Sequence, residues 1–280
     1  MHSKASVLVT GATGNVGRHV VAQLRAQGTP VTAFARTIED DGVRAVRGDL
    51  TRPETIPPAE TVFLLWRNLP SAAAPAVIDR LAVHAKRIVL LSSAVVGERN
   101  PVGEPNPIGE LHKDLEDLVE RAGVEWTFLR PGQFAANTLE WVPQIRGGDV
   151  VRGSHGDAAL TLLHERDLAA VAVAALTGDG HAGQRYVLTG PEVHIRAGLV
   201  PIIARVLGRD LRWEEGSEAE ERARMRAWMP AAFVDVVLAS RYHRPHHTTT
   251  VEAILGAPAR GYREWVEDHI ADFRNAPPKQ

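Results

Sequence analysis

The spacing that a nucleotide phosphate requires is found in three glycines near the start of the chain, Gly11, Gly14 and Gly17. They follow the apolar run Val7–Thr10, which is typical of a buried parallel strand, and precede a segment with helical apolar spacing. The first glycine permits a tight turn, the second lets the backbone approach a pyrophosphate, and the third allows close packing of helix on strand. The helix N-terminus adds unpaired N–H groups and a positive dipole end. This order predicts a dinucleotide site at Gly11, Thr13, Gly14, Asn15, Val16 and Gly17.

The end of the second predicted strand favours one dinucleotide over the other. Val31–Ala35 is an apolar run, and Arg36 follows it directly. In dinucleotide-binding folds a carboxylate at this place binds the ribose hydroxyls of NAD, whereas an arginine accommodates the 2′-phosphate of NADP. The strand end carries no carboxylate, although Glu39, Asp40 and Asp41 follow closely. Arg36 therefore favours NADP(H) over NAD, the alternative being a solvated surface arginine.

Contacts to the adenine are predicted after the third strand. Val43–Arg47 has a short strand pattern, and Asp49 and Leu50 follow at its carboxyl end, where the adenine edge lies in a doubly wound sheet. Asp49 is therefore a candidate partner of the adenine amino group. It is equally suited to cap the turn that begins at Thr51, and the two roles are compatible.

The tip of the fourth predicted strand is expected to border the nicotinamide half of the dinucleotide. This strand, Thr61–Trp66, ends in Leu65 and Trp66 and is followed by Arg67 and Asn68. Leu65 is a candidate cofactor contact. Trp66 either stacks on the cofactor or packs under a loop.

The elements that position these residues alternate between strands and helices. After the fifth strand, Arg87–Leu91, the pattern predicts a Gly- and Pro-rich loop that is a candidate lid, then a helix and a sixth strand, at residues 97–109, 110–122 and 124–129. Pro131 follows the sixth strand and is a further candidate cofactor contact. Such βα units predict a doubly wound parallel (Rossmann) sheet of the α/β class with right-handed crossovers.

The second half of the chain has a different character. We place the NAD(P)-binding domain at residues 1–140 and a smaller mixed cap, interwoven with the core, at residues 141–280. The cap is expected to cover the carboxyl edge of the sheet and to shape a substrate pocket. Its pattern predicts one strand at 185–189 and helices at about 163–176, 197–207, 218–239 and 262–273.

The composition limits the class of protein. At 280 residues, with 44% hydrophobic content, the chain is long enough for one large domain or for a nucleotide-binding core with a cap. A net charge of −2 gives no reason to expect binding to nucleic acid or membranes. The lack of cysteine excludes disulfides, thiolate nucleophiles and cysteine-ligated metals. No signal peptide or membrane-length apolar run is visible, which predicts a cytoplasmic protein.

Motifs spread along nearly the whole chain carry a resemblance to a known family. They are Thr10–Gly17, Arg36, Gly48–Leu50, Leu91–Ser93, Lys113, Gly123–Gly132, Phe134, Asn137, Gly183–Glu192 and Gly256–Arg260. With them the chain resembles the NmrA-like branch of the atypical short-chain dehydrogenases. The resemblance is specific for the fold and much less specific for activity. Members include NADPH-dependent quinone reductases, reductases of plant phenolics and NADP-binding regulators of transcription.

The wider dehydrogenase family uses a serine, a tyrosine and a lysine. The tyrosine donates a proton to the carbonyl oxygen, the lysine binds the nicotinamide ribose, and the serine orients the substrate. The resemblance assigns the serine to Ser93 and the lysine to Lys113, but the tyrosine position, four residues before the lysine, is Gly109. Either Lys113 alone binds the nicotinamide ribose and relays the proton, as the resemblance to the phenolic reductases suggests, or the substrate, such as a quinone, takes its protons from water. His112 points about 100° away from Lys113 around the helix and carries little weight.

Two clusters in the second half have a structural interpretation beside a functional one. His243, His246 and His247 have metal-binding side chains, but no Asp, Glu or Cys lies at ligand spacing, so a solvated basic loop or a pocket rim is favoured. A set of large apolar residues either lines an aromatic substrate pocket or forms the core of the cap: Trp213, Met225, Trp228, Met229 and Phe233.

These observations predict an NADP(H)-dependent oxidoreductase that transfers hydride to a quinone-like or conjugated small molecule. Its partners are expected to be an aromatic or quinone-like substrate and, at most, a second copy of the chain, so that it is a monomer or a homodimer. Two alternatives stay open. One is a non-catalytic NADP(H)-binding redox sensor, and the other is a non-redox enzyme of secondary metabolism on the same fold.

Overall fold

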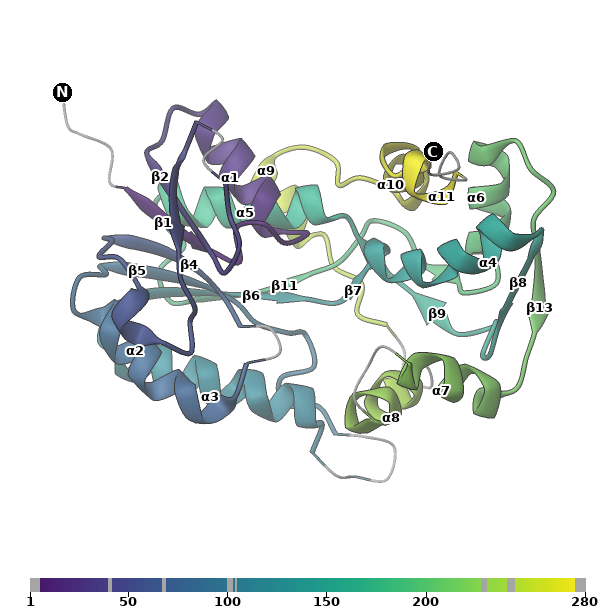
Figure 1. Cartoon of the computed structure of the whole chain (residues 1–280), viewed down its shortest axis with the longest axis horizontal. Coiled ribbons are helices and arrows are strands. Elements are labelled where there is room, and N and C mark those ends of the chain that lie inside the picture. The colour runs from purple at the N-terminus through teal and green to yellow at the C-terminus, as the bar shows by residue number, and fades with distance from the viewer. Residues whose placement is uncertain are drawn as a thin grey trace.

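A seven-stranded parallel sheet forms the centre of the protein (Figure 1). The computed structural model describes residues 6–39, 42–66, 69–99, 103, 105–227, 231–240 and 245–274. The strand order is β11-β6-β5-β4-β1-β2-β3. Its strands are β1 (Val7–Thr10), β2 (Val31–Ala35), β3 (Arg44–Arg47), β4 (Thr61–Leu65), β5 (Arg87–Leu91), β6 (Glu125–Pro131) and β11 (Gln184–Leu188). The order reverses between β1 and β4, which confirms the predicted doubly wound Rossmann fold.

Helices cover both faces of this sheet (Figure 1). The helices on one face are α1 (Gly17–Ala26), α5 (Glu165–Thr177) and α9 (Thr250–Leu255). Those on the other face are α2 (Ala74–Ala82) and α3 (Pro107–Arg121). Because side chains alternate along a strand, Val7 and Val9 pack against the first set and Leu8 against the second. Burial on both faces explains why the central strands are continuous apolar runs.

A smaller lobe beyond the carboxyl edge of the sheet forms the predicted cap (Figure 1). Its core is built from fully buried aromatic and aliphatic side chains, with Trp141, Tyr262 and Trp265 at its centre. The helices around it are α4 (Val142–Gly147), α6 (Leu199–Leu207), α10 (Tyr262–Asp268) and α11 (Ile270–Phe273). Short strand pairs complete it: β7 (Gln133–Phe134) with β10 (Leu162–Leu163), β8 (Val150–Gly153) with β13 (Arg212–Glu215), and β9 (Ala159–Leu160) with β12 (His194–Ile195). In the described part of the chain, 3-10 helices occur at Pro53–Thr55, Ser71–Ala73 and Ala135–Trp141.

The single helix expected at residues 218–239 is instead two helices, α7 (Glu218–Arg226) and α8 (Ala231–Ser240). The sequence between them contains Pro230, and a proline disfavours helical backbone in the residue before it. Of the large apolar residues predicted here, Met225 is buried against α8, and Trp213 packs against the core of the cap. Both therefore have the structural role. Trp228, Met229 and the side chain of Phe233 lie outside the described residues.

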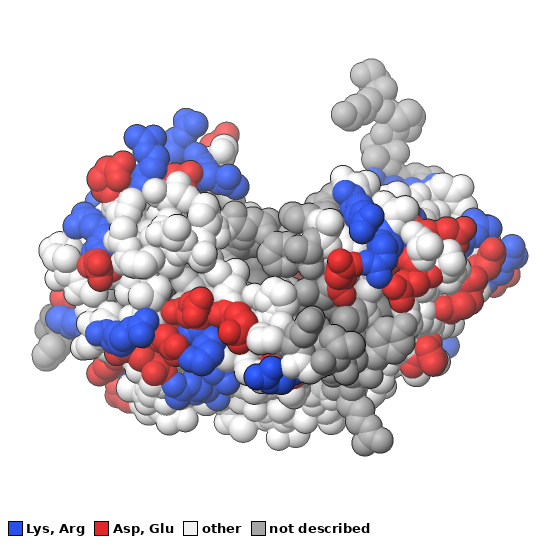
Figure 2. Space-filling view, turned by 90° about the horizontal axis from the view of Figure 1, so that it is seen from below, with Lys and Arg blue, Asp and Glu red and all other residues white. Residues whose placement is uncertain are grey.

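The two halves of the sequence are interwoven. Strand β11 pairs in parallel with β6, and α5 packs beside α1, so residues 165–188 return to the large sheet. The division near residue 140 stays a prediction. None of the described helices is long and apolar enough to cross a membrane. Figure 2 shows basic and acidic side chains interspersed on the face seen from below.

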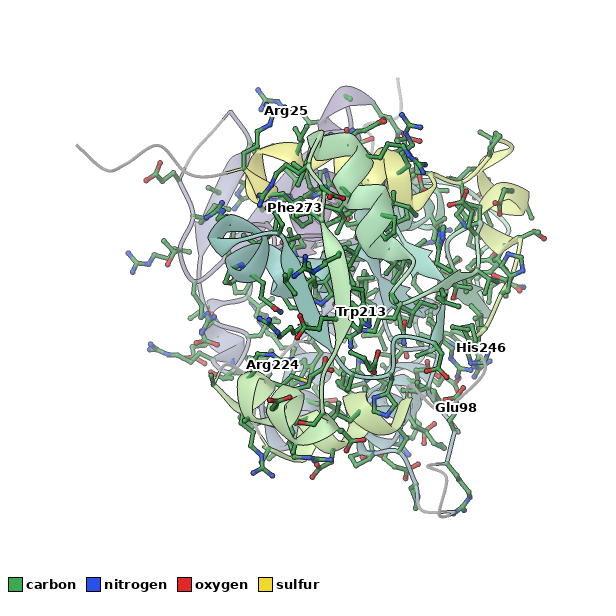
Figure 3. The ribbon with its side chains drawn as sticks, turned by 90° about the vertical axis from the view of Figure 1, so that its right-hand side faces the viewer. Arg25, Glu98, Trp213, Arg224, His246 and Phe273 are labelled. Atoms are coloured by element: carbon green, nitrogen blue, oxygen red, sulfur yellow. The ribbon has the colours of Figure 1, made fainter. Side chains whose placement is uncertain are left out.

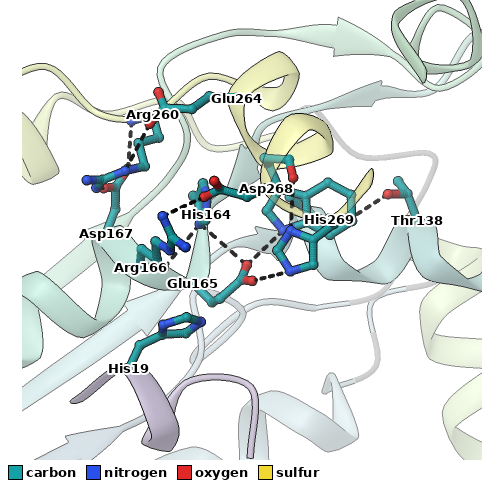
Figure 4. Close-up of polar contacts among 12 residues, drawn as sticks. His19, Thr138, His164, Glu165, Arg166, Asp167, Arg260, Glu264, Asp268 and His269 are labelled. Carbon is teal, nitrogen blue, oxygen red and sulfur yellow. Dashed lines mark hydrogen bonds and ion pairs between the residues drawn. The ribbon is translucent and has the colours of Figure 1, made fainter. Parts of the chain in front are cut away.

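A buried group of ionisable residues joins the C-terminal helices to α5, beside the start of α1 (Figure 4). Glu165 is 1% exposed, accepts a hydrogen bond from the indole of Trp265 (2.8 Å) and forms an ion pair with His269 (2.8 Å). Burial alone raises the pKa of Glu165, but His269 and the helix backbone lower it to about 2. Burial lowers the pKa of His269, but hydrogen bonding to Glu165 outweighs it and raises this pKa. The pair therefore links α5, which packs beside α1, to the C-terminal helices of the smaller lobe.

Candidate nucleotide and substrate site

The glycine turn has the conformation that close approach of a phosphate requires. Gly11 has φ of +61°, in the left-handed region, and its carbonyl oxygen accepts a hydrogen bond from the N–H of Gly14 at 2.9 Å. A Cβ at Gly17 would lie 2.2 Å from that same carbonyl oxygen, so only glycine fits there. Thr13, Gly14 and Asn15 are exposed, whereas Val16 is buried at the start of α1. The turn therefore presents backbone without side-chain cover above a helix N-terminus, which fits a pyrophosphate.

Arg36 and Asp49 lie at the carboxyl ends of the two neighbouring strands β2 and β3. Arg36 is exposed, and its carbonyl oxygen accepts a hydrogen bond from the side chain of Arg47 at 3.0 Å. Asp49 accepts hydrogen bonds from the N–H and the hydroxyl of Thr51, both at 2.9 Å, which lower its pKa. The predicted cap of the turn is thus confirmed. Leu50 beside it is buried.

The last residue of β4 packs against the glycine turn. Leu65 approaches Gly11: a Cβ at that glycine would lie 3.4 Å from the Leu65 side chain. The N–H of Leu65 donates to the hydroxyl of the fully buried Thr10 (2.8 Å), a contact between β1 and β4 that the sequence patterns did not predict. Trp66 is 4% exposed and packs in the core next to α2, so it does not stack on a ligand. Arg67 and Asn68 lie outside the described residues.

The two serines after β5 have different surroundings. Ser92 is buried, and its hydroxyl donates to the carboxylate of Glu116 at 2.5 Å. Glu116, 3% exposed, also binds the guanidinium of Arg130 in a bidentate pair of 2.9 and 2.5 Å. Ser92 is therefore held by the buried carboxylate of an ion pair. Ser93 is only partly buried, and its hydroxyl accepts a long hydrogen bond (3.5 Å) from the N–H of Val95.

Gly109, the position at which the resemblance leads one to expect a tyrosine, lies against the backbone of the turn after β5. A Cβ at Gly109 would lie 2.2 Å from the carbonyl oxygen of Val95, because α3 packs directly on the turn that follows β5. Pro131, at the end of β6, supports that turn by accepting a hydrogen bond from the N–H of Ala94 at 3.0 Å. A side chain of any size at Gly109 requires this turn or the helix to move.

Lys113 and His112 lie on different sides of α3. The ammonium group of Lys113 binds Asp117 one turn along at 2.6 Å, with 49% of the lysine side chain exposed, and this contact raises the lysine pKa. His112 is partly buried, and its Nδ1 lies 2.8 Å from the carbonyl oxygen of Ile108. Burial lowers the pKa of His112, against the opposing effects of Ile108 and Glu116. The predicted role of Lys113 stays a prediction.

A strap of residues 245–249 crosses the carboxyl edge of the sheet. The imidazole of His246 is 2.6 Å from the carboxylate of Glu98, in the loop after β5, and the two labelled side chains lie near each other in Figure 3. The carbonyl oxygen of His246 accepts a hydrogen bond from buried Thr161. His247 donates to the carbonyl oxygen of Pro191 at 3.1 Å. Among the described residues no group could hold a metal ion, and His243 lies outside them.

Together these features define a Rossmann-type dinucleotide-binding protein, with a complete phosphate turn on β1 and α1 and a second lobe over the carboxyl edge of the sheet. The sequence profile of an NAD(P)H-binding family matches residues 11–179. The chain belongs to this NAD(P)H-binding family. The predicted NAD(P)-binding family is thus confirmed.

Two curated relatives match nearly the whole chain. The (4-alkanoyl-5-oxo-2,5-dihydrofuran-3-yl)methyl phosphate reductase of Streptomyces griseus is 37% identical, and the match covers 95% of this chain and 99% of the relative. The NAD(P)H azoreductase of Xenophilus azovorans is 30% identical, with 95% and 99% covered. Among solved structures, the quinone oxidoreductase QOR2 of Escherichia coli complexed with NADPH has a TM-score of 0.78 at 20% identity, with 94% and 99% covered. The last match shows the fold alone.

Proposed function

We propose that the protein is an NADP(H)-dependent reductase that delivers hydride to a conjugated or quinone-like small molecule. The observation that carries the proposal is the complete glycine turn with Arg36 at the end of the adjacent strand. The guanidinium suits a 2′-phosphate because it can form two parallel hydrogen bonds to a phosphate group. The structural relative solved with NADPH supports the same preference.

The substrates named for the relatives share one chemical feature. The Streptomyces enzyme is named for an unsaturated lactone whose ring alkene is conjugated with carbonyl groups, and the Xenophilus enzyme for the azo group. NADPH supplies a hydride to such an acceptor. The negative charge that arrives is then delocalised onto an electronegative atom, which takes its proton from water. Substrates of this class do not depend on a tyrosine at residue 109.

The residues of the site hold the cofactor and the acceptor in different places. The turn residues bind the pyrophosphate, Arg36 the 2′-phosphate, and Asp49 with Leu50 the adenine. Leu65 and Pro131 border the nicotinamide. Ser93 orients an oxygen of the acceptor, because its hydroxyl is partly exposed at the carboxyl edge whereas that of Ser92 is held by Glu116.

The test is the oxidation of NADPH by the purified protein with a panel of acceptors. The panel contains quinones, azo dyes and unsaturated lactones. The matched controls are an unconjugated ketone and the saturated counterparts of the lactones. We expect turnover with the conjugated acceptors and none with the controls. Turnover with the plain ketone contradicts the proposed substrate class, and a lack of turnover with every acceptor contradicts the proposed activity.

A second candidate is a non-catalytic NADP(H)-binding sensor. It is favoured by one observation, the backbone of Val95 in the place of the family tyrosine. Tight binding of NADP⁺ combined with no turnover across the panel would select this candidate. Such a sensor has no need of a substrate, so its affinity for NADP⁺ should not change when conjugated acceptors are added.

A further inference from the structure

The contacts of Glu116, one turn further along α3, show where His112 lies relative to the sheet. The carboxylate of Glu116 binds the hydroxyl of Ser92, the first residue after β5, and the side chain of Arg130 in β6. Glu116 is therefore level with the last residues of these two strands. Helix α3 leads from the carboxyl edge of the sheet back to the start of β6, so its earlier residues lie further out. His112, one turn earlier, is about 6 Å beyond Glu116, above the carboxyl edge.

The face of α3 that holds His112 is turned toward the protein. The residues buried on this helix are Gly109, Leu115, Glu116 and Val119. Successive residues are rotated by about 100°, which places His112 in the middle of that face and Lys113 at its border. The exposures agree, because His112 is partly buried whereas Lys113 is exposed and bound to Asp117.

The hydrogen bond to Ile108 fixes which nitrogen of His112 can bind a ligand. Nδ1 lies 2.8 Å from the Ile108 carbonyl oxygen, and a carbonyl oxygen can only accept, so Nδ1 carries the hydrogen. Nε2 of the neutral ring is then an acceptor. Burial lowers the pKa of His112, which favours this neutral form.

The order of the strands gives the part of the cofactor that reaches this position. Arg36 and Asp49 follow β2 and β3, on one side of β1, so the adenosine half extends that way. The pyrophosphate lies at the turn after β1, and the nicotinamide half extends over β4 and β5. Strand β5 is two places from β1 in the sheet, about 10 Å away, and His112 lies above its end.

We propose that His112, and not Lys113, contacts the nicotinamide ribose of the bound cofactor, with Nε2 accepting a hydrogen bond from a ribose hydroxyl. The inference rests on the proposed NADP(H) site. It gives the histidine the place that the family resemblance assigns to the lysine. It also gives Gly109 a purpose, since its close contact with Val95 seats this end of α3 against the turn after β5.

The experiment compares two ligands that differ in the relevant half of the cofactor. NADP⁺ contains the nicotinamide ribose, whereas adenosine 2′,5′-bisphosphate has only the adenosine half. Calorimetric dissociation constants are measured for both, with wild type, His112→Asn, His112→Gln and the matched control Lys113→Gln. Asparagine keeps a donor near the position of Nδ1 and removes the acceptor, while glutamine can place its amide oxygen near Nε2.

We expect His112→Asn to weaken NADP⁺ binding about tenfold, which corresponds to one hydrogen bond. The bisphosphate should change by less than about twofold, as should both ligands with Lys113→Gln. His112→Gln should recover part of the loss. Melting temperatures verify folding, and if His112→Asn does not fold, His112→Met carries the same comparison.

Three results overturn the inference. They are unchanged NADP⁺ binding in His112→Asn, an equal loss for both ligands, and a selective loss in Lys113→Gln. The proposed function fails separately. If wild type binds NADP⁺ but reduces no acceptor, the activity is refuted while the ratio of the two dissociation constants still decides the role of His112. If wild type does not bind NADP⁺, both are refuted.

Discussion

Replacement of Gly109 by alanine is expected to destabilise the protein, whereas the same replacement at Gly147 is not. Both glycines lie in α-helices, α3 and α4, where alanine is otherwise the more favourable residue by up to about 1 kcal/mol. The surroundings differ. An added Cβ meets the Val95 carbonyl oxygen at 2.2 Å at Gly109, but meets nothing within 4 Å at Gly147. The two variants therefore separate the effect of the contact from that of helix propensity.

The magnitude follows from the distance at Gly109. A Cβ atom rarely approaches a heavy atom closer than 3.0 Å, so the turn after β5 or the start of α3 must retreat by about 0.8 Å. Overpacking of this kind costs ~1–3 kcal/mol, from which the gain in helix propensity is subtracted. We expect a net loss of about 1–2 kcal/mol, or a fall in melting temperature of about 2–4 °C for a chain of this size.

The assay is urea unfolding followed by circular dichroism, together with a thermal melt of each variant. Gly147→Ala should equal or slightly exceed the wild type. Gly109→Tyr, which introduces a tyrosine where the resemblance leads one to expect it, should be less stable than Gly109→Ala and should not gain activity toward plain ketones. If Gly109→Ala is as stable as Gly147→Ala, the turn is not packed on α3, and the absence of the tyrosine has another cause.

Three further outcomes are expected. Arg36→Ala should weaken NADP⁺ binding about tenfold or more and NAD⁺ binding little in calorimetry, and equal losses would show that the guanidinium does not contact a 2′-phosphate. Gly17→Ala should abolish binding of both dinucleotides, because its Cβ would lie 2.2 Å from the Gly11 carbonyl oxygen; retained affinity would refute the packing argument. The free energy of unfolding, measured in urea from about pH 3 to about pH 8, should be highest at intermediate pH and should fall toward both limits. Glu165 has a pKa of about 2, below its ordinary 4.5, so its contribution is lost as the pH falls from 4.5 toward 2. His269 has a raised pKa, so its contribution is present below pH 6.5 and lost as the pH rises through that raised value. In Glu165→Gln the acid-side decline should be smaller, and an unchanged pH profile would contradict this.

Sequence patterns predicted the parts of the molecule whose determinants are local. The buried strand β1, the glycine turn and α1 are adjacent in the chain, and the spacing of their residues dictates their conformation. The same holds for the cap of the turn after β3, where Asp49 and Thr51 are two residues apart. Trp66 could not be decided from sequence, because its burial depends on how α2 packs beside it.

The contacts that shape the substrate side come from residues far apart in the chain. Ser92, Glu116 and Arg130 belong to three successive elements, and no spacing rule links a serine after one strand to a carboxylate in the next helix. The strap contact between Glu98 and His246 is longer-ranged still. One signal was available in the sequence: the apolar stripe of α3 consists of Leu111, Leu115, Leu118 and Val119. Lys113 lies off this stripe, whereas His112 lies closer to it.

The rate that a tyrosine proton donor would contribute can be compared with the basicity of the oxygen that hydride transfer leaves on the acceptor. A positioned proton donor contributes about 10²–10⁴ in rate, or roughly 3–5 kcal/mol. Hydride addition to a plain ketone leaves an alkoxide, whose basicity is near that of hydroxide, with a conjugate-acid pKa of about 16. Addition to a quinone leaves a phenolate-like oxygen, for which the pKa is about 10, as in tyrosine. At ~1.4 kcal/mol per pKa unit the difference is about 8 kcal/mol, which exceeds what the donor supplies. Because Gly109 is packed on Val95, we expect this chain to lose turnover of the ketone more completely than turnover of the quinone. The ratio of the two turnover rates in the acceptor panel is the measurement that checks this, and comparable rates would contradict it.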